Sequence, residues 1–238
     1  MYYNISIDVC ITPPNLDRDD FSMTKNPSLE PLLARIEIML GRLKQAHPNA
    51  TYELDWDTPL QLLVGTILAA QCTDERVNRV TKTLFPKYPT AQAFADADIL
   101  ELEEDLKPTG FYRKKAQTVQ SMCQELVARF AGEVPPTMEQ LTTLPGVARK
   151  TANVVLNCAF DIPSGIIVDT HVARVSPRLG LSKQKNADKI ERDLMKLVPQ
   201  EDWTFFGPAV VLHGRYTCIA SSPKCSECIL ENICEQNI

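Results

Sequence analysis

The stretch Leu144-Pro145-Gly146-Val147-Ala148-Arg149-Lys150-Thr151-Ala152 carries the strongest structural signal in this chain. Its Pro-Gly pair favours a tight turn, and the flanking residues have helical character, so the stretch predicts two helices joined by a short hairpin. The second helix begins within two residues of the turn and presents unpaired backbone N–H groups at its positive end. Such groups suit a phosphate oxygen, although a plain connector between helices would have the same pattern.

Helical periodicity extends in both directions from this hairpin, and no segment has the period-two alternation of a convincing strand. Residues 29–46 carry apolar side chains at three- and four-residue spacing, and Thr58-Pro59 is a helix cap followed by proline at the first helical position. Gly110, Gly132 and Gly180 stand where helices should stop. The sequence therefore predicts an all-α protein. The expected helices cover residues 29–46, 59–70, 74–84, 91–107, 112–131, 138–143, 148–160, 170–178, 187–197 and 203–215.

Length and composition fit a globular protein with a real core. The 238 residues allow one large or two small domains, and 44% of them are hydrophobic. No apolar run approaches the roughly 20 residues of a membrane-spanning helix, and the start lacks the pattern of a signal peptide. We therefore expect a cytoplasmic protein that does not bind membranes.

The net charge of −5 counts weakly against a nucleic-acid-binding protein, which should have a basic face. Most of the negative charge lies in two acidic stretches, residues 1–30 and 91–107, and the rest of the chain carries a net charge of +3. Nucleic acid is therefore not excluded. The cations of that remainder include Arg113, Lys114, Lys115, Arg149, Lys150, Arg174 and Arg178.

Lys150 and Asp169 are the candidate catalytic residues. Lys150 falls in the first turn of the helix after the hairpin, where the positive helix end disfavours an ammonium and favours the nucleophilic free amine. A phosphate-binding lysine would occupy the same place, so the residue alone leaves both roles open. Asp169 follows an apolar run and precedes a new helix, where it makes a good N-cap. An N-cap and a catalytic carboxylate are compatible roles.

Four cysteines, Cys218, Cys225, Cys228 and Cys234, are compressed into 17 residues near the end of the chain. In a cytosolic protein such a group indicates a metal site rather than disulfides. The spacing alone leaves zinc and an iron–sulfur cluster equally open, because both accept four thiolates. The other cysteines are scattered, and we expect them to be packing residues: Cys10, Cys72, Cys123 and Cys158.

Together the hairpin, the lysine, the aspartate and the cysteine spacing resemble the endonuclease III family of DNA glycosylases, which belongs to the helix-hairpin-helix superfamily. The resemblance continues through residues 153–157 and 168–172 and covers about residues 29–238. It departs at Ala148, where many members have a second glycine. It implies that Lys150 is the catalytic lysine, that Asp169 is the catalytic aspartate, and that the four cysteines hold a [4Fe–4S] cluster.

The function implied by the resemblance is base-excision repair of duplex DNA that contains damaged pyrimidines or abasic sites. The enzyme would be a bifunctional N-glycosylase and AP lyase that removes oxidised pyrimidines. The Lys150 amine would displace the base from the sugar, form a Schiff base, and cut the strand on the 3′ side by β-elimination. The resemblance further implies a monomer, and a nucleoid-associated one if the source is prokaryotic.

The resemblance also assigns residues to DNA handling. Gln71 matches the glutamine that fills the gap left by the flipped nucleotide, and Phe111 stands where the family places an apolar wedge. An ordinary helix-end glutamine and a core aromatic residue are the alternatives for these two. The remaining candidate DNA contacts are Leu144, Gly146, Ala148, Arg149 and Thr151 in the hairpin and Lys224 between cysteine ligands.

The expected fold has two helical lobes with DNA in the cleft between them. Residues 52–163 would form one lobe, which ends in the helix-hairpin-helix. Residues 29–51 and 164–238 would form the other lobe, including the cysteine loop at 218–234. Residues 1–28 would be a flexible acidic extension. We expect Lys150 and Asp169 to face one another across the cleft.

Two other functions remain open on the sequence. One is a monofunctional adenine or mismatch glycosylase of the same superfamily, although such relatives usually lack the lysine. The other is a non-catalytic iron–sulfur DNA-binding protein.

Overall fold

The protein is all-α over residues 30–235, the part that the computed structural model describes. The predicted acidic extension and Cys10 lie outside the described residues. No strand occurs within 30–235, so the expected fold class is confirmed. The helices are α1 (Glu30–Ala46), α2 (Pro59–Leu68), α3 (Asp74–Lys87), α4 (Ala91–Ala95), α5 (Ile99–Leu106), η1 (Lys107–Thr109), α6 (Tyr112–Phe130), α7 (Met138–Leu141), α8 (Arg149–Ala159), α9 (Thr170–Arg178), α10 (Ala187–Leu197), η2 (Gln200–Asp202), α11 (Trp203–Tyr216), η3 (Cys225–Glu227) and η4 (Glu231–Ile233).

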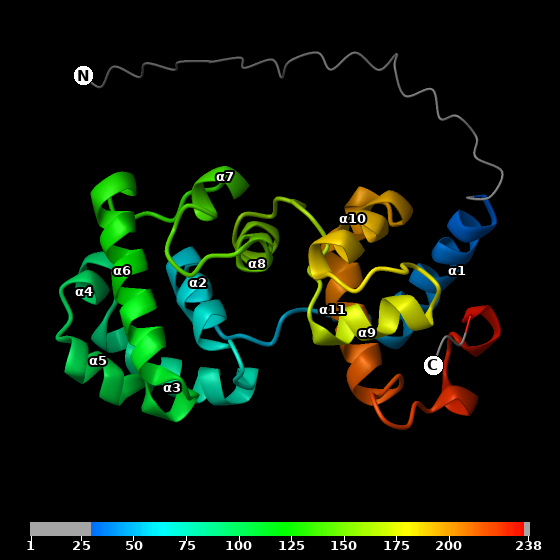
Figure 1. Cartoon of the computed structure of the whole chain (residues 1–238), viewed down its shortest axis with the longest axis horizontal. Helices are drawn as coiled ribbons and strands as arrows, with labels where there is room; N and C mark the ends of the chain where they lie inside the picture. The colour runs from blue at the N-terminus through cyan, green and yellow to red at the C-terminus, as the bar shows by residue number, and fades with distance from the viewer. Residues whose placement is uncertain (1–29, 236–238) are drawn as a thin grey trace, which may run out of the picture.

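The described helices form two groups, which we call the first lobe (α2–α8) and the second lobe (α1 and α9–α11) (Figure 1). Each group has its own core of buried apolar side chains. The two cores meet in the extended segment before α9, where Ile166 packs in the second lobe and its neighbour Ile167 packs in the first. This alternation follows from the period-two geometry of extended backbone. The domain boundaries predicted from sequence remain a prediction, supported by this division of the core.

The single helix predicted for residues 91–107 is wrong. The chain forms two short helices there, α4 and α5, because Asp98 starts a new helix. The Asp98 carboxylate accepts hydrogen bonds from the backbone N–H groups of Leu100, at 2.9 Å, and Glu101, at 3.0 Å. A side chain that satisfies two N–H groups in this way defines an N-terminus rather than a helix interior. The segment contains several other acidic residues, so nothing in the sequence distinguished Asp98 as a helix cap.

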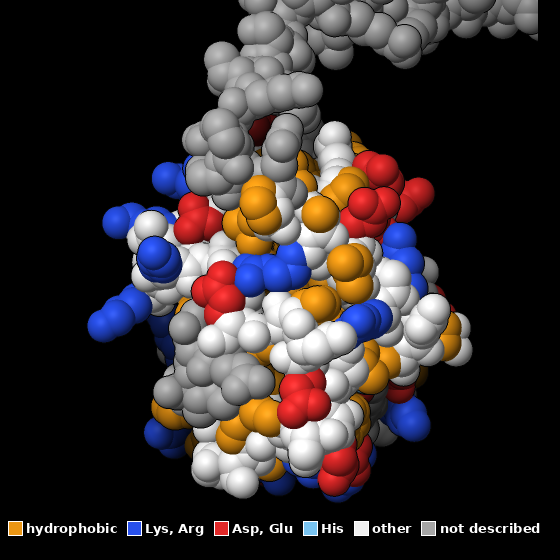
Figure 2. Space-filling view, turned by 90° about the vertical axis from the view of Figure 1, so that its right-hand side faces the viewer, with side chains coloured by type: hydrophobic (Ala, Val, Ile, Leu, Met, Phe, Trp, Pro, Cys, Tyr) orange, Lys and Arg blue, Asp and Glu red, His pale blue; other side chains and the backbone are white. Residues whose placement is uncertain are grey.

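The outer surface of the second lobe has a mixed character. Figure 2 shows that acidic, basic and hydrophobic side chains are interspersed on this face. None of the helices within 30–235 is both long and apolar enough to cross a membrane.

Candidate active site

The hairpin predicted at residues 144–152 joins α7 to α8. Leu144 is buried in the first-lobe core, and its carbonyl accepts a hydrogen bond from the Val147 N–H at 3.1 Å. Gly146 has a φ of +76°, and a side chain there would collide with the methyl group of Thr118. Glycine is therefore required at this turn. Ala148 has a φ of −84°, so an alanine is acceptable where relatives often have glycine.

The start of α8 leaves its first backbone donors open. Ala148 is the N-cap residue, and its methyl group cannot accept a hydrogen bond. Among residues 30–235, nothing accepts a hydrogen bond from the N–H groups of Arg149, Lys150 or Thr151. The Lys150 side chain is exposed and Thr151 is half-buried. The first turn of α8 therefore presents donors and an amine together at a positive helix end.

Arg149 has a protein partner in the second lobe. Its guanidinium donates two hydrogen bonds to Glu191 of α10, from Nε at 2.8 Å and from Nη2 at 2.9 Å. The Glu191 carboxylate is 3% exposed and raises the pKa of Arg149. The Asn153 amide donates to the same carboxylate at 2.8 Å. Glu191 therefore stabilises the start of α8 from the opposite lobe. The sequence did not predict this role, because no motif near Glu191 indicates its partners.

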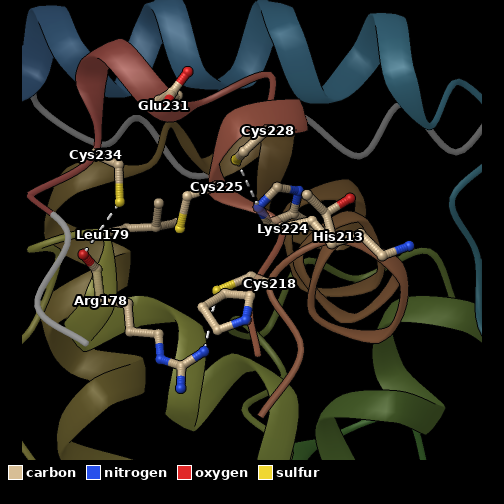
Figure 3. A pocket seen from close by; sticks show the side chains of 11 residues that line it. Arg178, Leu179, His213, Cys218, Lys224, Cys225, Cys228, Glu231 and Cys234 are labelled. Carbon is tan, nitrogen blue, oxygen red and sulfur yellow. Dashed lines mark hydrogen bonds between the residues drawn. The ribbon is translucent and has the colours of Figure 1, made fainter. Parts of the chain in front are cut away.

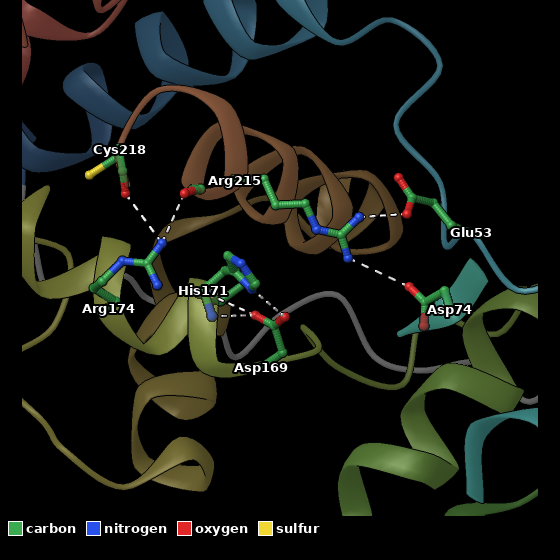
Figure 4. Close-up of polar contacts among 9 residues, drawn as sticks. Glu53, Asp74, Asp169, His171, Arg174, Arg215 and Cys218 are labelled. Atoms are coloured by element: carbon green, nitrogen blue, oxygen red, sulfur yellow. Dashed lines mark hydrogen bonds and ion pairs between the residues drawn. The ribbon is translucent and has the colours of Figure 1, made fainter. Parts of the chain in front are cut away.

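Asp169 is the N-cap of α9, as expected from sequence. Its Oδ1 accepts hydrogen bonds from the backbone N–H groups of His171, at 2.8 Å, and Val172, at 2.9 Å. Its Oδ2 lies 3.1 Å from Nδ1 of the His171 ring (Figure 4). These contacts leave the half-buried carboxylate in one orientation, and His171 is its immediate neighbour.

Gln71 and Phe111 lie in two loops of the first lobe, and both have left-handed backbone, with φ values of 53° and 47°. Gln71 is exposed, and Phe111 is 68% exposed. A core role for Phe111 is therefore excluded. Left-handed φ is uncommon for residues with a side chain, and such strain concentrates at functional sites.

Lys115, which the sequence grouped with the cations outside the acidic stretches, is 5% exposed. Its ammonium donates hydrogen bonds to the carbonyl of Leu68 at 2.7 Å and to the carbonyl of Thr109 at 2.9 Å. Burial lowers the pKa of this lysine. A signal was present, because Lys115 lies in register with Val119, Cys123 and Leu126 on the buried face of α6.

The four clustered cysteines line a single pocket in the second lobe (Figure 3). Nitrogen donors lie beside two of the four sulfurs, and a third, Cys234 Sγ, donates to the Arg178 carbonyl at 3.4 Å. Arg178 donates to Cys218 Sγ at 3.5 Å, the Leu230 N–H donates to Cys228 Sγ at 3.4 Å, and His213 Nε2 lies 3.6 Å from Cys228 Sγ. Donors around sulfur are typical of thiolates that ligate a cluster. Lys224 is exposed at the rim.

The cysteine pocket brings the donor set of a metal centre together. Its lining includes all four clustered cysteines. A [4Fe–4S] cluster is held by four cysteine thiolates, and zinc accepts the same four ligands. The residues present therefore fit an iron–sulfur cluster, and the metal itself is decided by spectroscopy.

Two arginines connect these regions (Figure 4). Arg174 of α9 donates to the carbonyls of Gly214, at 2.9 Å, and Cys218, at 3.2 Å. Arg215 of α11 pairs with Glu53 in the segment between the lobes and with Asp74 at the start of α3. The second lobe is thus tied both to its own cysteine loop and to the first lobe.

Comparison with known proteins places these features in a family. Residues 64–200 match the model of the HhH-GPD superfamily base excision DNA repair protein. Endonuclease III of a Synechocystis strain is 57% identical over 81% of this chain and 88% of its own length. Endonuclease III of Bacillus subtilis is 44% identical over 86% of this chain and 93% of its own length.

Solved structures are similar to this chain in the same way as the curated relatives. A trapped endonuclease III–DNA covalent intermediate has a TM-score of 0.82 and 42% identity, and the match covers 86% of this chain and 96% of that one. A thermostable thymine-DNA glycosylase, 20% identical with a TM-score of 0.77, shares the fold. The chain therefore belongs to the endonuclease III family within the HhH-GPD superfamily of base excision DNA repair proteins, as its hairpin, lysine and cysteine spacing predicted.

Proposed function

We propose that this chain is a bifunctional DNA N-glycosylase and AP lyase that removes oxidised pyrimidines from duplex DNA. The observation that carries the proposal is the exposed Lys150 amine at the uncapped start of α8. The family supports the proposal, because an endonuclease III–DNA covalent intermediate has been trapped. A covalent protein–DNA intermediate requires a nucleophile on the protein.

Lys150 is proposed as that nucleophile. Its free amine forms a bond to the anomeric carbon of the sugar as the bond from that carbon to the base breaks and the base leaves with the electron pair. Loss of a proton and opening of the sugar ring give a Schiff base. Removal of a proton from C2′ then expels the 3′ phosphate, which cuts the strand on the 3′ side.

Asp169 is proposed to assist deprotonation of the lysine and to stabilise the positive charge that develops on the sugar. The two backbone N–H groups that bind Oδ1 keep the carboxylate in a fixed orientation during these steps. Its second oxygen, Oδ2, accepts no backbone hydrogen bond, and its one polar partner among the described side chains is the His171 ring. That oxygen is the one we assign to the chemistry.

DNA is proposed to lie across both lobes. The open N–H groups after the hairpin suit a backbone phosphate, with Gly146, Ala148 and Thr151 lining the approach. Leu144 is buried, so it would contribute only through backbone, and Arg149 would act mainly through its bond to Glu191. Gln71 and Phe111 would enter the duplex beside the flipped nucleotide.

The cysteine pocket is proposed to hold a [4Fe–4S] cluster on Cys218, Cys225, Cys228 and Cys234. When bound, the cluster would crosslink the end of the chain and fix the fold of this loop. The exposed Lys224 at the rim would contact a phosphate. We also propose that the protein acts as a monomer in the cytoplasm.

Borohydride trapping tests the enzymatic proposal. With duplex DNA that contains thymine glycol, we expect a covalent complex that Lys150→Ala abolishes and Lys82→Ala, an exposed lysine on α3, leaves intact. Release of the base without trapping would instead indicate the monofunctional glycosylase. Absence of base release in the cluster-loaded protein would indicate a non-catalytic binding protein.

Spectroscopy tests the cluster. The purified protein should show visible absorbance in the iron–sulfur charge-transfer region, with four iron atoms per chain. Cys225→Ala should reduce both quantities. Zinc as the sole metal would contradict the assignment.

A further inference from the structure

The two loops that carry Gln71 and Phe111 share an unusual backbone state. Both residues are exposed and have left-handed φ, although neither is glycine. Such conformations cost free energy and persist only where the surrounding structure enforces them. Two strained, exposed side chains in separate loops of one lobe therefore need an element that holds them.

The backbone hydrogen bonds of each loop reach only positions nearby in the sequence, such as the bond from the Lys115 N–H to the Phe111 carbonyl at 3.1 Å. The Cys72 N–H donates to the Ala69 carbonyl at 3.1 Å, and the Gly110 N–H donates to the Lys107 carbonyl at 3.4 Å. Neither bond connects the Gln71 loop to the Phe111 loop. Among the hydrogen bonds of the described residues, only those of the Lys115 side chain join the two loops.

Lys115 reaches both loops from the buried face of α6. Its ammonium binds the carbonyl of Leu68, the last residue of α2, three positions before Gln71. It also binds the carbonyl of Thr109, the last residue of η1, two positions before Phe111. Both carbonyls end a helix, where the orientation of the peptide dipoles favours a cation. One buried charge thus fixes the direction in which two separate loops leave their helices.

Burying the Lys115 ammonium costs desolvation free energy, so we expect this lysine to have a specific role. Within residues 30–235 its ammonium forms no ion pair, and burial lowers its pKa. An apolar residue would pack against the same face of α6 without that desolvation cost. It would leave the two buried carbonyls without their shared donor.

We infer that Lys115 is a positioning residue for base extrusion, which sets the relative placement of Gln71 and Phe111 so that both enter the duplex in one step. The inference rests on the proposed insertion of these two side chains. Lys115 itself contacts neither DNA nor the reacting atoms. It acts through the two loops.

The test compares Lys115→Met and Lys115→Arg in the cluster-loaded enzyme. Duplex DNA carries thymine glycol, with 2-aminopurine in the opposite strand next to the lesion as a fluorescent reporter of unstacking. We expect Lys115→Met to bind the duplex but to lose most of the fluorescence rise and to slow borohydride trapping about tenfold, since small misplacements carry penalties of that order or larger. Lys115→Arg, which keeps donors for both carbonyls, should restore most of both signals. Lys82→Met, the same change at an exposed position, should behave like the wild type.

A double-mutant cycle separates positioning from general destabilisation. In a Gln71→Ala/Phe111→Ala background, Lys115→Met should have no further effect on the fluorescence rise or on trapping, because the side chains it places are gone. Effects that add fully would show that Lys115 acts elsewhere, and would overturn the inference. If Lys115→Met does not fold, Lys115→Gln replaces it, because its amide still supplies a donor to one carbonyl.

The outcomes distinguish this inference from the proposed function. Loss of trapping in Lys150→Ala together with wild-type fluorescence and trapping in Lys115→Met would overturn only the role of Lys115. Wild-type behaviour of Gln71→Ala/Phe111→Ala would overturn the insertion of these side chains and the role of Lys115 with it. Failure of the wild-type enzyme to release the base would overturn the proposed function, whatever Lys115 does to the fluorescence.

Discussion

The helices α8 and α9 carry the two proposed catalytic residues at their starts, and they begin in opposite ways. At α9 the first donors are bound by the Asp169 side chain, which is held in place by them. At α8 the cap is Ala148, and no described residue accepts from the first N–H groups. What stabilises that end instead is Glu191, which binds Arg149 and Asn153 from the other lobe.

The difference shows how one kind of structural element serves two chemical needs. A helix end that satisfies itself fixes a carboxylate without help from DNA. A helix end that stays open keeps its donors for an incoming phosphate, and it needs a distant brace because it lacks a local cap. Substitutions at the N-termini of α8 and α9 can therefore test separately the capping of each helix, the charge of Asp169 and the binding of a phosphate.

The largest effect should come from Asp169→Asn. Asparagine is as good an N-cap as aspartate, so the start of α9 should survive while the negative charge is lost. We expect turnover on thymine glycol duplex to fall at least about 100-fold, with the melting temperature nearly unchanged. Single-turnover kinetics and thermal denaturation provide the two measurements.

Asp98→Asn is the matched control. Asp98 caps α5 with the same two backbone hydrogen bonds and plays no part in the proposed site. This variant should keep full turnover. Equal losses of turnover in both variants would mean that capping, not charge, is what the enzyme needs from Asp169.

The second effect is on stability. Glu191→Ala removes the buried carboxylate that accepts from Arg149 and Asn153, and should lower the free energy of unfolding by about 2–3 kcal/mol, since Arg149 is partly exposed. Denaturant unfolding measures it. Glu75→Ala, which breaks an exposed pair with Arg79, should cost less than about 0.5 kcal/mol. Equal losses in the free energy of unfolding for the two variants would show that the contacts of Glu191 between the lobes stabilise the protein no more than an exposed ion pair does.

The smallest effect should come from making α8 start like α9. Ala148→Asp supplies the missing cap and should stabilise the protein by about 1 kcal/mol, while its charge occupies the place proposed for a phosphate. We expect weaker duplex binding by fluorescence anisotropy. Ala148→Ser adds a cap without charge and should retain more of the affinity. A gain in affinity for Ala148→Asp would contradict phosphate binding at this helix start.

Much of the fold was predictable because its signals are local. Helix periodicity, the Thr58 cap and the Pro145-Gly146 turn place most helices within a few residues of their observed bounds. The cysteine spacing indicated a metal site shared by the four residues, and their side chains do line one pocket. Asp169 as an N-cap was also readable, since a cap depends only on the residues that follow it.

What the sequence did not reveal depends on contacts between distant residues. The role of Glu191 follows from its contact with Arg149, 42 positions earlier, and looks like one more exposed acid on α10 in the sequence. Lys115 was grouped with the cations outside the acidic stretches, although its register on α6 placed it on the buried face. Side chains that act across the tertiary fold have no short-range signature, because their partners are chosen by packing.

The division of the second lobe between the two ends of the chain also has a consequence for biosynthesis. Of the described helices, α1 leaves the ribosome first, yet Arg35 pairs with Glu235 at 2.8 Å and Arg42 binds the Ile229 carbonyl at 2.7 Å. The contiguous first lobe can fold while translation continues, whereas α1 must wait until Ile229 and Glu235 have been synthesised. The pocket lined by the four cysteines therefore takes shape only after Cys234 has been synthesised. A chain that stops before Cys218 would have its hairpin complete and its second lobe unclosed.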